Sequence, residues 1–247
     1  MKICLASPSN WKFLKEDYSC CKYMLESFFT MEEWLIPIIK KCDLFLLDSG
    51  AFTFMNSKKK KSHNFDEYLT EYINFINKND IKYFFELDID SIVGIEEVER
   101  LRKRLENETQ KKCIPVFHKS RGKDYFIKMC QEYDYIAIGG IVTKEIKPEE
   151  YKYFKWFIDT AHSYGCKIHG LGFTNLKSLR YYNFDSVDST SWKSGGRYGT
   201  CYHFTGREIK VVDTNNRRRR GDISHHDLDR HNYYEWVKFQ KYAEERL

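Results

Sequence analysis

The chain has 247 residues, a length that one α/β barrel can fill. Hydrophobic residues make up 42% of the chain and aromatic residues 17%, a composition that supports a large core and excludes a disordered chain. Lysine and arginine number 41 against 36 aspartates and glutamates, and this net charge of +5 is too small to indicate a nucleic-acid partner by itself.

The apolar segments and the cysteines indicate the compartment. The start, MKICLASPSNW, is too short an apolar stretch for a signal peptide, and no run of some 18 apolar residues predicts a membrane span. The eight cysteines are scattered without a C-x-x-C pair, which argues against a cysteine-based zinc site and favours reduced thiols in the core. We therefore expect a cytoplasmic protein (in the host cytoplasm if the chain is viral) with no membrane partner.

Short apolar runs alternate with longer amphipathic segments along the first 190 residues. The runs predict buried strands at 2–7, 44–49, 82–89, 113–120, 135–140, 167–173 and 184–190. The segments between them space their apolar residues as helices do, at 65–76, 95–106, 122–132 and 148–163. Strands separated by helices of this length indicate right-handed crossovers and a parallel sheet.

Seven such strands without a linker predict a single domain over residues 1–247, an α/β fold of the (β/α)8 TIM-like barrel type. A doubly wound open sheet is the alternative, but the glycine-rich nucleotide turn after the first strand is missing. After residue 190 the pattern changes. Residues 200–212 predict a β-hairpin around Thr205-Gly206, followed by a basic loop and a helix from about Asp227 to Leu247 on the barrel exterior.

Polar residues and glycines follow the predicted strands at the points where they end: Asp48, Asp88 and Asp90, His118, Gly139 and Gly140, His169, and Asp188. In a barrel these ends converge on the face that carries the active site. The alternative is that each aspartate caps the following helix. That alternative suits Asp90 or Asp185 better than Asp48, because Gly50 and two more aromatic residues follow Asp48 before any helical pattern.

Carboxylates that meet across one pocket are compatible with two kinds of chemistry. Two of them without a metal suggest a reaction at an acetal-like carbon, in which one is the nucleophile and the other handles protons or stabilises positive charge. A magnesium site built from Asp48, Asp88 and Asp188 is the other possibility, and the spacing alone does not exclude it.

Three segments resemble motifs of the tRNA-guanine transglycosylases, in the order that this family has them. DSGAF (48–52) resembles its D-S-G-G-F motif, YIAIGGIVTKE (135–145) its A-I-G-G-L-x-V-G-E segment, and NFDSVDSTSW (183–192) its late V-D-x-F-D-S/C strand. FFELDID (84–90) is similar to the family's F-D-E-C segment, and IPVFHKS places His118 where the family usually carries a glutamine. The resemblance covers about residues 44–200.

The resemblance implies a role for each matching position. Asp188, rather than Asp185, would be the nucleophile that attacks the sugar C1′ and forms a covalent glycosyl intermediate, and Asp48 would handle the proton. Asp88 would accept hydrogen bonds from guanine, and His118 would be a further contact to the base. The backbone of Gly139-Gly140 would donate to the O6 atom, because glycine permits a close approach. Ser49 and Gly50, inside the DSGAF motif, complete the predicted substrate site.

The chain also departs from the family. Its tRNA members hold zinc with three closely spaced cysteines and a histidine, whereas this chain has in that region only Cys201 with His203, His225, His226 and His231. We therefore expect no zinc subdomain, no metal and no cofactor, and without that region a monomer is favoured. A small version lacking zinc resembles the phage DpdA-type DNA deoxyguanosine transglycosylases. This implies exchange of guanine in DNA for a 7-deazaguanine base, with DNA favoured over tRNA.

A polynucleotide substrate would explain the basic runs. The target base must leave its stack to reach the nucleophile, and phosphate contacts would then come from Lys193 and Arg197 and from the run Arg217, Arg218, Arg219 and Arg220. Lys58–Lys61 would flank the same face, and Trp192 and Tyr198 could stack on bases, although a core role for Trp192 is as plausible. Three alternatives stay open: the same exchange on tRNA, a small-molecule barrel enzyme (metal-dependent or nucleoside-processing), and a silent nucleic-acid binder.

Overall fold

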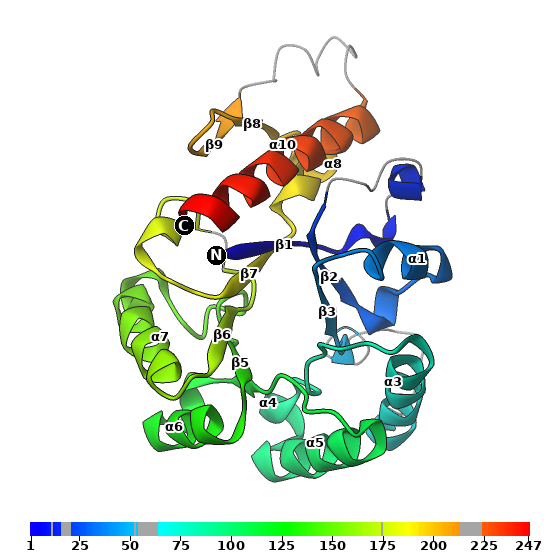
Figure 1. Cartoon of the computed structure of the whole chain (residues 1–247), viewed down its shortest axis with the longest axis vertical. Coiled ribbons are helices and arrows are strands. Elements are labelled where there is room, and N and C mark those ends of the chain that lie inside the picture. Colours follow the sequence, from blue (N-terminus) through cyan, green and yellow to red (C-terminus); the bar gives the residue numbers. More distant parts are fainter. Residues whose placement is uncertain (11, 16–20, 52, 54–63, 174, 213–223) are drawn as a thin grey trace.

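A curled parallel sheet lies at the centre of the fold (Figure 1). The computed structural model describes residues 1–10, 12–15, 21–51, 53, 64–173, 175–212 and 224–247. Seven strands form the sheet in the order β3-β2-β1-β7-β6-β5-β4, and every neighbouring pair is parallel. Their bounds are β1 Lys2–Ala6, β2 Tyr23–Ser27, β3 Leu44–Asp48, β4 Val116–Phe117, β5 Tyr135–Ile138, β6 Lys167–Gly170 and β7 Ser186–Ser189.

Residues 83–86 lie between the two edge strands of this sheet. Two isolated parallel bridges, Leu47 with Phe84 and Phe85 with Ile114, connect this segment to β3 and to the residues before β4. The predicted strand at 82–89 is therefore reduced to single-residue bridges, and the predicted complete barrel is observed only as a curled sheet of seven strands. The sequence patterns also missed one of these strands, β2.

The helices cover the outer face of the sheet (Figure 1). The predicted helices are present as α3 Phe65–Asn79, α5 Ile95–Thr109 and α6 Lys123–Glu132, while the fourth begins as a 3₁₀ helix, Pro148–Tyr153, and continues as α7 Phe154–Ser163. Short helices are α1 Ile36–Ile39, α4 Asp90–Val93 and α8 Ser194–Tyr198, and further 3₁₀ turns are Pro8–Asn10, Lys12–Lys15, Phe28–Thr30, Glu33–Leu35, Lys119–Arg121, Leu179–Tyr181 and Ser191–Lys193. No helix in the described ranges is long and apolar enough to cross a bilayer.

Alternation along the strands produces two separate cores. On β1, Ile3 and Leu5 pack in the outer core with the helices, whereas Cys4 and Ala6 belong to a smaller inner cluster. That inner cluster is built from strand residues: Cys4, Ala6, Tyr23, Leu25, Leu44, Leu46, Phe85, Ile114, Val116, Tyr135 and Ala137. Because side chains alternate along a strand, Asp48 continues the inner row that Leu44 and Leu46 begin on β3. The sheet therefore turns the end of β3 toward its own interior.

The C-terminal segment packs beside β1. Strands β8 Cys201–Phe204 and β9 Ile209–Val212 form the predicted antiparallel hairpin, and the predicted last helix is α10 His225–Arg246. This helix crosses beside β1 and α8 (Figure 1). Its buried Gln240 donates to the carbonyls of Ile3 and Tyr23 at 2.7 and 2.9 Å, which ties the helix to β1 and β2. The basic runs Lys58–Lys61 and Arg217–Arg220 lie outside the described residues.

Candidate active site

A cavity of about 1330 Å³ opens at the carboxyl ends of the strands. Its lining includes every residue that the sequence assigned to catalysis or substrate binding: Asp48, Ser49, Gly50, Asp88, His118, Gly139, Gly140 and Asp188. A smaller hollow of about 510 Å³ lies along α5 and is lined largely by exposed charged side chains. The larger cavity is therefore the candidate site, since it gathers groups from several strands.

Asp48 stands at the end of β3, where a tight turn leads away from the strand. Gly50 has φ +67°, and a Cβ atom there would lie 2.3 Å from Ser27 Oγ, so the turn requires glycine. The backbone N–H of Gly50 donates to the Asp48 carboxylate. Burial, followed by the negative charges of Asp88 and Asp188, outweighs this hydrogen bond and raises the pKa of Asp48 to about 7. Near neutral pH, Asp48 is therefore able both to give and to accept a proton.

Asp188 lies on β7, opposite Cys4 of β1, and is nearly buried. Its Oδ1 atom accepts a hydrogen bond from the Gly172 N–H at 2.6 Å, and His169 Nε2 lies 3.3 Å from the same oxygen. Asp185 lies toward the other end of the strand, where its Oδ2 accepts from the Ile168 N–H at 2.8 Å and lies 3.0 Å from His162 Nε2. Of these two aspartates, Asp188 lines the cavity and Asp185 does not.

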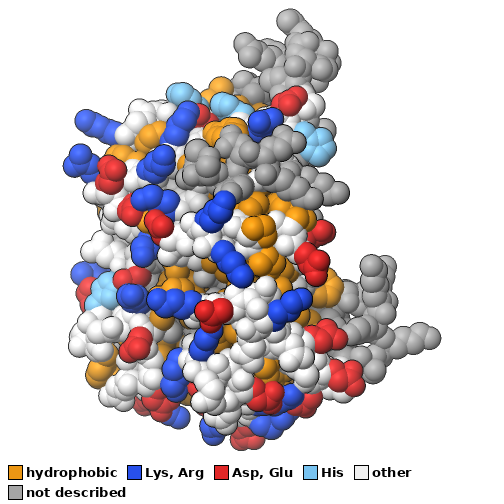
Figure 2. Space-filling model, turned by 45° about the vertical axis from the view of Figure 1, so that its right-hand side comes forward, with side chains coloured by type: hydrophobic (Ala, Val, Ile, Leu, Met, Phe, Trp, Pro, Cys, Tyr) orange, Lys and Arg blue, Asp and Glu red, His pale blue; other side chains and the backbone are white. Residues whose placement is uncertain are grey.

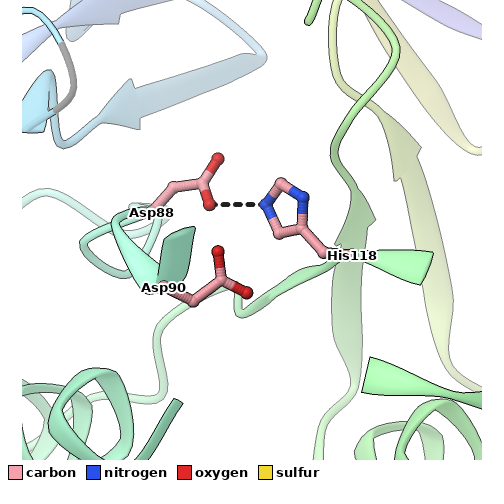
Figure 3. A group of neighbouring side chains, drawn as sticks. All are labelled: Asp88, Asp90 and His118. Carbon is pink, nitrogen blue, oxygen red and sulfur yellow. Dashed lines mark hydrogen bonds and ion pairs between the residues drawn. The ribbon is translucent and has the colours of Figure 1, made fainter. Parts of the chain in front are cut away.

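His118 is held between two carboxylates. Its Nε2 atom lies 2.6 Å from Asp88 Oδ1, a contact visible in Figure 3, and its Nδ1 atom lies 2.8 Å from Glu145 Oε2. Burial lowers the pKa of His118, but the hydrogen bond and charge of Asp88 and the hydrogen bond of Glu145 outweigh it and raise this pKa to about 9. His118 is therefore a cation at neutral pH. The sequence patterns missed Glu145, although it lies in the segment that resembles the family.

The two glycines after β5 make room for this histidine and its partner. A Cβ atom on Gly139 would lie 2.7 Å from Val116 Cγ1 and 2.9 Å from the His118 ring, and one on Gly140 would lie 2.7 Å from Glu145 Oε2. Close approach of His118 and Glu145 is thus a second reason for the glycines, beside the predicted close approach of a base, which stays a prediction. The Gly139 N–H donates to the Phe117 carbonyl, whereas the Gly140 N–H meets no acceptor among the described residues.

Ion pairs hold the other charged groups at this end of the fold. Arg121 Nε lies 2.9 Å from Asp90 Oδ2 and its Nη1 lies 3.4 Å from Glu86 Oε1, while Lys119 lies 2.9 Å from Glu150. Asp88, Asp90 and His118 offer ligand atoms within 4.8 Å of one another, the one such group that could hold a metal among the described residues. It differs from the set that the sequence suggested, since it lacks Asp48 and Asp188. A cation there would compete with the Asp88–His118 and Asp90–Arg121 contacts.

The residues predicted to contact nucleic acid are placed differently from one another. Lys193 is buried and its Nζ donates to the Ser7 carbonyl at 3.0 Å, so it is not the exposed cation expected for a phosphate contact. Arg197 and Tyr198 are exposed on α8. Trp192 is fully buried and donates to the Ala6 carbonyl at 3.0 Å, which is the core role.

The described surface shows no single basic patch on the face drawn in Figure 2, where basic and acidic side chains are interspersed. Among the C-terminal histidines, His231 lies 2.8 Å from the Tyr202 carbonyl and His203 lies 3.4 Å from Glu235, so these two exposed residues connect the hairpin with α10. Arg217, Arg218, Arg219 and Arg220 lie outside the described residues, and their predicted role stays a prediction.

No protein-family model matches the chain, and no curated protein matches it. Solved structures similar to it include the carboxyl transferase domain of Rhizobium etli pyruvate carboxylase with pyruvate (TM-score 0.48, 14% identity) and with oxalate (TM-score 0.47, 15% identity). These alignments cover 98% of this chain and 48% of the other, so the chain spans about half the length of those proteins. The residues of the cavity are therefore the basis from which a function can be inferred.

Proposed function

We propose that this protein is a transglycosylase that replaces guanine in DNA with a 7-deazaguanine base through a covalent intermediate on Asp188. The observation that carries the proposal is that Asp48 and Asp188, 140 residues apart in the chain, line one cavity while the pKa of Asp48 is raised to about 7. A nucleophilic carboxylate and a second carboxylate poised to exchange a proton are the two groups that double displacement at a sugar carbon needs.

The reaction would proceed in two displacements at C1′. In the first, an Asp188 oxygen forms a bond to C1′ as the bond from C1′ to N9 of guanine breaks, and protonated Asp48 supplies the proton that the departing base takes up. In the second, N9 of the incoming base attacks C1′, the bond to Asp188 breaks, and Asp48 accepts the proton released from N9. Each group then returns to its starting state, which is why a pKa near the working pH suits Asp48.

The acceptors and donors of the cavity fit the edge of guanine. Asp88 offers a carboxylate to the N1–H and amino groups, and His118 holds that carboxylate in place from the other side. The Gly140 N–H, which meets no acceptor among the described residues, would donate to O6. A base that leaves these groups unpaired once it fills the cavity loses about 1–3 kcal/mol for each of them. Guanine and 7-deazaguanine share this edge, so the same contacts would serve both half-reactions.

We also propose that residues 83–86 act as the eighth strand, so that the sheet closes into a (β/α)8 barrel within one domain. Supporting this are the two bridges and four backbone hydrogen bonds of 2.8 to 3.1 Å that join the segment to Leu47 on one side and Ile114 on the other. In the closed barrel this segment, which leads into Asp88, would lie between β3 and β4, so that Asp48, Asp88 and His118 would surround one opening.

The polynucleotide would reach the cavity with its target base swung out of the stack. We propose Arg197 and the run Arg217–Arg220 as the phosphate contacts, with DNA preferred over tRNA, a monomer as the working unit and the cytoplasm as its location. Incorporation of labelled guanine into DNA and into tRNA, measured side by side, decides between the two nucleic acids. Incorporation into tRNA alone would contradict the DNA assignment and retain the chemistry.

Trapping of the intermediate tests the function directly. Active protein that is incubated with DNA and then denatured should retain a covalent DNA adduct. When a 7-deazaguanine base is added before denaturation, the adduct should be discharged. Asp188→Asn should abolish the adduct, whereas Asp185→Asn, which changes an aspartate at the other end of the same strand, should form it. An adduct that persists in Asp188→Asn, or DNA exchange without any adduct, would overturn the assignment of the nucleophile.

A metal-dependent enzyme acting on a small molecule is the second candidate. The group Asp88, Asp90 and His118, with ligand atoms within 4.8 Å of one another, favours it. Exchange that continues undiminished after exhaustive chelation supports the transglycosylase. Activity lost with chelator and restored by a divalent cation supports the metal enzyme.

A further inference from the structure

A chain of hydrogen bonds behind Asp188 is not used by the reaction as described above. His169, which is completely buried on β6, lies with Nε2 3.3 Å from Asp188 Oδ1 and with Nδ1 2.5 Å from Ser186 Oγ. Ser186 Oγ in turn is hydrogen-bonded to the hydroxyl of Tyr135 on β5. Phe85 packs against the imidazole, with the ring centres 5.5 Å apart. This series of hydrogen bonds therefore runs through the interior of the sheet from Tyr135 to the proposed nucleophile.

Counting donors and acceptors along this chain selects one arrangement of protons. If Tyr135 donates to Ser186 and Ser186 donates to His169 Nδ1, then Nδ1 is an acceptor and Nε2 carries the proton, which it donates to Asp188. The opposite tautomer would place the Nε2 lone pair against the carboxylate. A doubly protonated imidazole would turn the Ser186 hydroxyl toward Tyr135, whose own proton would meet no acceptor among the described residues. Only the neutral Nε2–H form gives every proton in this series of hydrogen bonds an acceptor.

We propose that His169 is a positioning residue for the nucleophile, which as the neutral Nε2–H tautomer donates to Asp188 Oδ1 together with the Gly172 amide and leaves Oδ2 to attack the sugar. The part of this inference that concerns the sugar rests on the proposed function, whereas the tautomer and the hydrogen bond do not. The geometry supports different roles for the two oxygens, because both donors to Asp188 among the described residues contact Oδ1.

The two donors on Oδ1 would act unequally on the two displacements. In the covalent intermediate, Asp188 is a neutral ester, and in the second displacement it leaves C1′ as a carboxylate that regains its negative charge. Hydrogen bonds to Oδ1 are stronger to that charge than to the ester, so they assist departure of Asp188 from the sugar. Loss of the His169 donor should therefore slow discharge of the intermediate more than its formation, and the adduct should accumulate.

The tautomer can be measured without any substrate. In protein carrying ¹⁵N-labelled histidine, His169 (identified by the signals that disappear in His169→Gln) should show a protonated Nε2 and an unprotonated Nδ1. Ser186→Ala removes the donor to Nδ1 and should raise the fraction of the Nδ1–H form, and Tyr135→Phe should do so to a lesser degree. A protonated Nδ1 in the unaltered protein, whether alone or with Nε2, would overturn the inference.

The effect on chemistry is measured by following the DNA adduct during a single turnover. His169→Phe should slow discharge of the adduct by about 10- to 100-fold, the loss expected for one hydrogen bond to a charged group. His169→Gln, whose amide can reach the place of Nε2, should recover part of that loss, and Ser186→Ala should show a smaller slowing with little change to its fold. His162→Gln is the matched control, because it alters a His–Asp pair that lies outside the cavity, His162 with Asp185.

The outcomes separate this inference from the proposed function. If the unaltered protein forms no adduct with DNA or tRNA, the proposed function fails, while the ¹⁵N measurement still decides the tautomer and the hydrogen bond. If the adduct forms and its discharge is equally fast in His169→Phe, Ser186→Ala and His162→Gln, the function stands and the positioning role is refuted. Equal slowing of formation and discharge in His169→Phe, without recovery in His169→Gln, would also refute it, because a general structural defect explains that result.

Discussion

Asp48 and Asp188 line the same cavity although β1 and β2 separate their strands in the sheet. The charge of Asp188 is one of the causes that raise the pKa of Asp48, after burial and the charge of Asp88. Curvature of the sheet favours this coupling, because in a flat sheet the inner rows of β3 and β7 would point in the same direction, with two strands between them, instead of toward a common interior. Two carboxylates therefore line one cavity, which is the arrangement that the proposed two-carboxylate mechanism needs.

The first prediction concerns the proton carried by Asp48. Asp48→Asn should lower base exchange by about 10²- to 10⁴-fold, because general acid–base catalysis contributes that much. The pH–rate profile of the unaltered protein should change slope near pH 7, and the variant should lack that change of slope. Asp43→Asn, at the opposite end of the same strand and exposed, is the control and should keep both the rate and the profile. Full activity in Asp48→Asn would contradict the role of the residue.

The same carboxyl group should make stability depend on pH. The pKa of Asp48 is higher in the folded chain, about 7, than in an unfolded chain, so the folded state binds more protons between about pH 4 and pH 7. The contribution of this group to stability is therefore largest below pH 4. It is lost as the pH rises through the folded pKa of about 7. Urea unfolding should show Asp48→Asn to be more stable than the parent at pH 8, by about 1–3 kcal/mol, and the difference should shrink toward pH 5. A less stable variant at pH 8 would refute this.

His118 should contribute in a different window. Its pKa is raised in the folded state to about 9, so its stabilising effect is fully present below about pH 6.5 and is lost as pH rises through 9. His118→Gln should remove this part of the pH dependence and should destabilise the protein at pH 6.5, because Asp88 and Glu145 would face each other without the cation. The size expected is about 1–3 kcal/mol, measured by denaturant unfolding at pH 6.5 and 9.5. His162→Gln, an exposed histidine, is the comparison.

Gly50 should tolerate no side chain. Gly50→Ala combines a positive φ with a Cβ atom 2.3 Å from Ser27 Oγ and 2.7 Å from Phe29 Cβ, so we expect a loss of about 2–4 kcal/mol and a displaced Asp48. Gly165→Ala, just after α7, has a similar positive φ of +72° but no atom within 4 Å, and should cost only about 1 kcal/mol. The free energies of unfolding of the two variants, measured by heat or urea, separate the cost of the positive φ from the cost of the collision of Cβ with its neighbours. Equal losses would show that the turn yields at Ser27.

Glu86 should contribute more to the free energy of unfolding than a carboxylate in exposed ion pairs does. It is completely buried, accepts from the Val116 N–H at 2.7 Å, and lies between Arg102 at 3.3 Å and Arg121 at 3.4 Å. Glu86→Gln removes the buried charge between two nearly buried cations, which keep among the described carboxylates only Asp90 (for Arg121) and Glu99 (for Arg102), and should cost about 3–5 kcal/mol. Asp66→Asn breaks the exposed pairs with Arg100 and Arg104 and should cost less than about 1 kcal/mol. Unfolding free energies of the two variants test the contrast.

Glu26 shows why one strand was missed from the sequence. β2 has the sequence YMLES, and a charged residue inside a short apolar run weakens a strand pattern. The glutamate is nonetheless fully buried, because its carboxylate accepts hydrogen bonds from the Ser9 and Ser27 amides and from the Thr30 hydroxyl at 2.7 to 2.9 Å. Ser27 ends β2 itself and Thr30 follows in the next 3₁₀ turn, but Ser9 comes from the turn after β1, 17 residues earlier, and no local pattern predicts that contact.

Local periodicity and the polar residues at strand ends were enough to predict most of the parallel strands, the outer helices, the C-terminal hairpin with its helix, and the residues gathered at the cavity. These features could be predicted because alternation along a strand is local and because parallel strands end at one face. Only the tertiary structure decided how the charges at that face act: Glu145 opposite His118, Asp88 and Asp188 beside Asp48, and His169 behind Asp188. Electrostatic and hydrogen-bonded partnerships depend on distances between strands far apart in the chain, and it is burial among those partners that turns ordinary carboxylates into candidate catalysts.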